Sequence, residues 1–139
     1  MTKRTGGAWG NMEPRIKLWF SAPGTEGVFG DGKWRLLQAI DREGSLRAAT
    51  DALQISYRKA WGDLRKAEGY LGVRFVERRR GGAGGGQAYL TEEGHAWVAA
   101  YTRLRAKLEA AVGREFNTMA AEVDKPVVKG TRKRKGKLK

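Results

Sequence analysis

Two amphipathic helical patterns separated by a three-residue connection, in GSLRAATDALQISYRKAWGDLRKAEGYLG (residues 44–72), constrain the fold of this chain most strongly. In the first pattern, about 46–53, apolar residues recur at helical spacing, and Ser45 is placed to cap the N-terminus. In the second, about 57–71, Ser56 is the corresponding cap. An apolar stripe on that second helix consists of Ala60, Leu64, Ala67 and Leu71. Two short helices joined by so tight a turn predict a helix-turn-helix.

Strand-like and helical segments flank this motif on both sides. RIKLWF, residues 15–20, alternates charged with apolar residues and predicts a half-buried strand, with a second short strand at 27–29. A helix is expected from Asp31 until Gly44 stops it. VRFVERRR and QAYL enclose a glycine run, which predicts a hairpin with a long tip, the wing of a winged helix-turn-helix. We therefore expect a mainly α protein with a small β-sheet, whose DNA-binding domain spans residues 15–91.

A long helix over 92–116, capped by Thr91, is predicted to follow the wing. Its apolar residues have a spacing close to a heptad repeat, which favours packing against a partner. The expected dimerisation residues are Trp97, Tyr101, Leu104, Leu108 and Val112. Residues 1–14 are expected to be a flexible arm and residues 117–139 a disordered basic tail.

Charge and residue types restrict the class of function. The formal net charge of +13 predicts an anionic partner, either nucleic acid or a membrane surface. No apolar run is long enough to span a bilayer and no secretory signal is recognisable, so we expect a cytoplasmic protein. Because the chain has no cysteine and His95 is its only histidine, we expect no metal site, no thiol nucleophile and no cofactor.

The second helix of the motif is the expected recognition helix, since a single helix fits the major groove of DNA. Candidates for base readout are Tyr57, Arg58, Trp61, Gly62 and Arg65. Candidates for phosphate contacts are Ser45, Arg47, Ser56, Lys59 and Lys66. The wing residues expected near the DNA backbone or its minor groove are Arg78, Arg79, Arg80, Gly81, Gly82, Gly84, Gly85 and Gly86.

Alternatives remain open for several of these residues. Trp61 lies next to Ala60 on the helical wheel, so it either packs in the core or lies on DNA, and Tyr57 alternatively plugs the end of the preceding helix. A basic helical face can simply be solvated, and His95 is more typical of a surface or packing residue than of a ligand. The glycine run could also be a linker or a nucleotide loop. However, Gln87 and Ala88 follow its last glycine, so neither Walker A nor G-x-G-x-x-G is complete, and no catalytic carboxylate pair stands out.

ISYRKAWGDLRKAE and ERRRGGAGGGQAYLTEEG resemble the DNA-binding domain of ModE-type molybdate-responsive transcriptional regulators over about residues 15–113. The most specific matches are Ser56, Tyr57, Ala60 and Trp61, with the wing glycines leading to Leu90, Thr91 and Gly94. Residues 44–72 are also similar to the broader LysR-type pattern. Gln54 stands where such turns frequently have glycine, so we expect slight backbone strain there.

The resemblance implies a winged helix-turn-helix that dimerises through its long helices and binds a palindromic DNA operator. Full-length members add a C-terminal sensor of β-barrel modules that binds molybdate. Only a basic tail follows the long helix here, so no sensor residue is carried over, and a separate molybdate-binding protein is a possible partner. The leading hypothesis is a sequence-specific, dimeric, double-stranded-DNA-binding regulator linked to molybdate or related oxyanion metabolism, and not an enzyme. The alternative is a nonspecific architectural DNA-binding protein.

Overall fold

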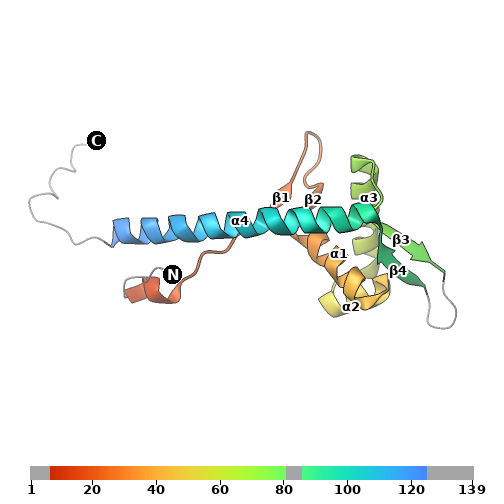
Figure 1. The fold of residues 1–139 in the computed structure, drawn as a ribbon, viewed down its shortest axis with the longest axis horizontal. Coiled ribbons are helices and arrows are strands. Elements are labelled where there is room, and N and C mark those ends of the chain that lie inside the picture. Colours follow the sequence, from red (N-terminus) through yellow and green to blue (C-terminus); the bar gives the residue numbers. More distant parts are fainter. Residues whose placement is uncertain (1–6, 81–85, 125–139) are drawn as a thin grey trace, which may run out of the picture. The chain divides into compact units, whose positions relative to one another are not determined.

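The computed structural model describes residues 7–80 and 86–124 (Figure 1). These residues belong to two compact units. The larger unit spans residues 17–106, and the smaller one joins residues 1–16 with residues 107–139. In the described part of the chain, no helix combines the length and apolar character needed to cross a membrane.

Helices α2 (Leu46–Leu53) and α3 (Tyr57–Leu71) of the larger unit form the expected motif, and α1 (Asp31–Glu43) precedes it as expected (Figure 1). The Ser45 hydroxyl accepts from the Ala48 amide at 3.0 Å, and the Ser56 hydroxyl accepts from the Lys59 amide at 3.1 Å. Both predicted caps are therefore confirmed. Gln54, in the turn, has φ 58°, the left-handed conformation that glycine adopts more readily.

Two antiparallel strand pairs accompany these helices. Strand β1 (Trp19–Phe20) pairs with β2 (Phe29–Gly30), and β3 (Val76–Arg79) pairs with β4 (Gln87–Leu90) to form the predicted hairpin. The strand expected over residues 15–20 is limited in the structure to the two residues of β1. Leu18 is instead bonded to Asp31, because its carbonyl accepts from the Asp31 amide and its amide donates to the Asp31 carboxylate.

The core of this unit lies between the helical motif and the first turns of α4 (Glu92–Val123). Phe29 and Phe75 are fully buried, and their ring centroids lie 4.9 and 5.4 Å from that of Trp97. Gly94 permits this close packing, since a Cβ there would collide with the Phe75 carbonyl oxygen. Thr91 caps α4 as predicted, by accepting from the Gly94 amide at 2.9 Å.

A buried ion pair, absent from the sequence predictions, joins the start of α1 to α4 in this unit. Arg105 donates to both carboxylate oxygens of Asp31, at 2.8 and 2.9 Å, and the Tyr101 hydroxyl donates to Asp31 at 2.7 Å. These bonds, those from Arg105 first, hold the pKa of Asp31 well below its usual range. Burial, together with the bond to Asp31, raises the pKa of Tyr101.

Two expectations for the long helix need correction. Tyr101 is 3% exposed and bonded inside its own chain, and Trp97 is partly buried against the same core, so these two residues of the expected dimer stripe serve the fold of the single chain. The helix also ends at Val123 rather than at residue 116, because NTMAAEV continues it, with Ala120 buried in the smaller unit.

The N-terminal arm is not structureless over its described part. Residues Gly7–Asn11 form a 3-10 helix, and the Trp9 ring packs edge-on against Phe116 of the smaller unit, with centroids 5.6 Å apart. Such an edge-on aromatic pair stabilises one position of the Trp9 ring, which a flexible arm would not have. The expected flexible arm over 1–14 is therefore wrong for these residues, while residues 1–6 lie outside the description.

Candidate nucleic-acid interface

The side of α3 opposite its buried stripe is open and basic. Arg58 and Gly62 are exposed, and a Cβ built on Gly62 would meet nothing within 4 Å. Arg65 is exposed beside them. The inward stripe is buried as predicted at Ala60, Leu64 and Ala67, while Leu71 is only partly buried. Thus α3 is anchored by one side and presents its arginines on the other.

Two aromatic residues on the flank of α3 that faces the wing hold arginines from three elements. The Arg47 guanidinium of α2 lies 4.1 Å from the Tyr57 ring centroid, and the Tyr57 hydroxyl accepts from Arg78 of β3 at 2.9 Å. The Trp61 ring has Arg78 at 4.7 Å and Arg65 at 5.0 Å. We call these five residues the arginine–aromatic cluster. Trp61 packs partly against the core, as one of its two readings expected, and the reading that places it on DNA stays a prediction.

Glu68, which sequence reasoning missed, fastens the wing to α3. Its carboxylate is buried and accepts from the amides of Phe75 and Val76 at 2.7 and 3.2 Å, while Arg65 donates to its other oxygen at 3.3 Å. The available signal was its position four residues after Leu64, beside the buried stripe. An acidic residue at such a position needs partners, since an unpaired buried charge is costly.

Of the five residues expected to contact phosphate, three already have partners through their polar groups, and the other two are an exposed lysine and an arginine of the cluster. The hydroxyls of Ser45 and Ser56 are used as helix caps, and Lys59 forms an exposed ion pair with Asp63 at 3.0 Å. Lys66 is exposed, and Arg47 belongs to the cluster. An exposed pair such as that of Lys59 is worth little, so the lysine can exchange its partner for a phosphate at small cost.

The described part of the wing is basic along β3. Arg78 contacts the cluster, and Arg79 lies over the Tyr89 ring at 5.5 Å and donates to its hydroxyl at 3.4 Å. Arg80 and Gly86 are exposed. The tip residues Gly81, Gly82, Gly84 and Gly85 lie outside the described residues.

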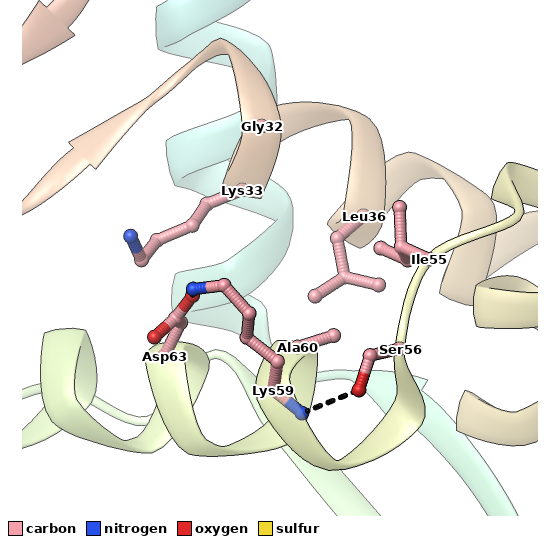
Figure 2. Close-up of a pocket in the computed structure, with 8 residues that line it drawn as sticks. All are labelled: Gly32, Lys33, Leu36, Ile55, Ser56, Lys59, Ala60 and Asp63. Carbon is pink, nitrogen blue, oxygen red and sulfur yellow. Dashed lines mark hydrogen bonds and ion pairs between the residues drawn. The ribbon is translucent and has the colours of Figure 1, made fainter.

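A cavity of about 410 Å³ opens on the opposite flank of α3, towards the start of α1 (Figure 2). Leu36, Ile55 and Ala60 supply apolar lining, while Lys33 and Lys59 reach its edge. Burial lowers the pKa of Lys33, although the nearby Asp63 carboxylate opposes that shift. The two flanks of α3 thus differ. One carries arginines stacked on aromatic rings, and the other has lysines at the edge of an apolar cavity.

Comparisons with known proteins agree with this architecture. Residues 32–95 match the family described as "Bacterial regulatory helix-turn-helix protein, lysR family". The chain is 36% identical over 84 residues to "Molybdenum transport protein ModE" of Azotobacter vinelandii, which covers 60% of this chain and 31% of that protein. It is 35% identical over 104 residues to "Molybdenum-pterin-binding protein MopA" of Rhodobacter capsulatus, which covers 74% of this chain and 39% of that protein. It therefore spans well under half the length of these curated relatives.

Among solved structures, the "Crystal Structure of BenM_DBD/benA site 1 DNA Complex" is similar with a TM-score of 0.47 and 22% identity, over 69% of this chain and 97% of that one. The match to residues 32–95 runs from α1 to the first turn of α4 and contains the whole helical motif and the wing. Residues 32–95 therefore match a lysR-family helix-turn-helix domain, and the chain is similar to relatives named ModE and MopA.

Proposed function

We propose that this chain is a sequence-specific DNA-binding transcriptional regulator linked to molybdenum metabolism. The observation that carries the proposal is the open face of α3, bounded on one flank by arginines of α2, α3 and β3. A helix of this kind fits the major groove, where arginine donates bidentately to guanine. Arg58 and Arg65 are the base readers in this proposal, and Gly62 lets the backbone approach the groove.

The wing and the start of α2 supply the contacts to the DNA backbone. Arg47, Lys66 and the β3 arginines, with the net charge of +13, support an electrostatic contribution that positions the protein without reading sequence. Within residues 7–80 and 86–124, no group of three or more potential metal ligands is present. We propose that the interface serves recognition of DNA, because the groups it exposes are guanidinium and ammonium groups suited to phosphate and base contacts.

A homodimer formed through α4 is part of the proposal. Leu104 is 39% exposed, and Leu108 and Val112, further along the helix, are partly buried. With Trp97 and Tyr101 committed to the core of the single chain, the stripe available to a second copy begins at Leu104. Two copies would place two recognition helices on half-sites of a palindromic operator, about one helical turn apart.

The link to molybdenum rests on the names of the relatives. ModE is named for molybdenum transport, and MopA and MopB, both of Rhodobacter capsulatus, for molybdenum-pterin binding. We propose that this chain controls genes of the same or related oxyanion metabolism, and that a separate molybdate-binding protein supplies the signal. DNA binding measured with and without molybdate, and with that protein added, tests this part.

The second candidate is a nonspecific architectural DNA-binding protein, favoured by the high basic charge. The two candidates differ in the ratio of specific to nonspecific affinity, because a coating protein has a steep salt dependence and no preferred sequence. Competition between a selected and a random duplex at fixed salt separates them. In the regulator, Arg58→Ala relaxes specificity at one base position, whereas removal of residues 125–139 weakens binding to every sequence alike.

A further inference from the structure

Tyr57 and Trp61 occupy positions on α3 from which a side chain could read bases, yet arginines already engage both. One guanidinium from α2 lies on the Tyr57 ring and another from β3 bonds to its hydroxyl. The second of these, Arg78, also lies on the Trp61 ring. Cation–π contacts and a hydrogen bond restrict the rotamers of long side chains that would otherwise be mobile on a surface.

The charges in this arrangement are unbalanced. Arg65 has the buried Glu68 as its carboxylate partner. Across residues 7–80 and 86–124, neither Arg47 nor Arg78 has a carboxylate oxygen within 4.0 Å. Two guanidinium groups that contact one tyrosine repel each other, and an anion placed against both relieves that repulsion. Guanidinium groups match phosphate particularly well, because their planar forks donate two parallel hydrogen bonds.

We propose that Arg47 and Arg78 form one composite phosphate site for the backbone of double-stranded DNA, and that Tyr57 is its positioning residue rather than a base reader. The inference rests on the proposed function and adds a specific assignment to it. Trp61 supports the site by holding Arg78 from the side. The wing arginine is thereby tied to α3, so that α2, α3 and the wing bind one stretch of backbone together, instead of Arg78 entering the minor groove independently.

The chain offers a matched control. Tyr89 on β4 also accepts from an arginine and lies under its guanidinium, but that arginine is Arg79, and the pair touches no residue of α3 in the contacts described above. Tyr57→Phe and Tyr89→Phe therefore remove the same hydroxyl from two arginine–tyrosine pairs. Only the first change should affect the composite site.

The experiment measures affinity of the full chain for a labelled random-sequence duplex over a range of salt concentrations, because phosphate contacts do not depend on base sequence. Arg47→Ala and Arg78→Ala should each reduce the slope of log K against log salt concentration by about 0.9. Tyr57→Leu, which removes ring and hydroxyl, should reduce it by more than either arginine change alone. Tyr57→Phe should weaken binding about fivefold, and that loss should vanish in an Arg78→Ala background.

Tyr89→Phe should weaken binding clearly less than Tyr57→Phe, and its effect should be the same with and without Arg78, because it leaves the composite site intact. Thermal unfolding of each variant checks that it is folded. The inference is overturned if Tyr57→Phe costs as much without Arg78 as with it, since the hydroxyl would then contact DNA itself. An unchanged slope for Tyr57→Leu, or an equal loss from Tyr89→Phe, overturns it as well. In these cases the wild type still binds DNA, and the proposed function stands. If the wild type binds no duplex at any salt concentration, both proposals fail together.

Discussion

Replacing Glu68 by alanine should destabilise the domain and separate the wing from the recognition helix. The carboxylate is the acceptor for the amides of Phe75 and Val76, and both of these residues are almost completely buried. A buried donor left without an acceptor costs about 1–3 kcal/mol. Two such donors set an upper range of about 2–6 kcal/mol, and because water entering the gap recovers part of it, we expect a loss of about 3 kcal/mol.

Glu68→Gln separates the hydrogen bonds from the charge. Its carbonyl oxygen can still accept from both amides, and the lost attraction to Arg65 is small because that side chain is 47% exposed. We therefore expect a loss of about 1 kcal/mol for glutamine. Urea denaturation measures the stability loss of both variants, as a lower midpoint concentration with an unchanged dependence of the free energy of unfolding on urea. Glu77→Ala, on the exposed side of β3, is the control and should stay within about 0.5 kcal/mol of the wild type. A Glu68→Ala variant as stable as this control would show that the Glu68 carboxylate is not needed to satisfy the two amides.

Three further changes test the fold. Because the pKa of Asp31 is depressed in the folded state, its ionised carboxylate stabilises the fold above pH 3.8, and this stability is lost as the pH falls below that value. Asp31→Asn should therefore lower the free energy of unfolding by about 3 kcal/mol at pH 7, measured by chemical denaturation, and should make stability less dependent on pH at acid pH. An acid dependence as steep as that of the wild type would contradict this. Gly94→Ala should lower the thermal midpoint strongly, because its methyl group would meet the Phe75 carbonyl; an unchanged midpoint would show that the contact can relax. Gln54→Gly should raise the free energy of unfolding by about 0.5 kcal/mol, since relief of the positive φ exceeds the entropy cost of glycine, and a decrease would count against strain in the turn.

The helix-turn-helix was predictable because its signals are local. Ser45 and Ser56 cap neighbouring amides, and the stripe on α3 repeats at the helical period, so each is legible within a few residues of sequence. The hairpin was equally local, with its register set between β3 and β4.

The parts that escaped prediction depend on residues distant in sequence. Asp31 and Arg105 are 74 positions apart, and nothing in either neighbourhood indicates the pairing. The same holds for Tyr57 and Arg78, which are 21 positions apart. Tyr101 was expected on a dimer stripe because heptad spacing does not distinguish a helix that faces a partner from one that faces its own domain. Periodicity identifies the buried side of a helix, while the identity of the covering element requires the fold.

Selection of DNA by the full chain from a random pool, at fixed salt and without added effector, decides between a sequence-specific regulator and an architectural protein. We expect an enriched sequence with two-fold symmetry and half-sites about one helical turn apart, and loss of preference at one position of each half-site in Arg58→Ala. A pool from which no sequence is enriched, while the protein still binds duplex DNA, would rule out a sequence-specific regulator and support the architectural alternative.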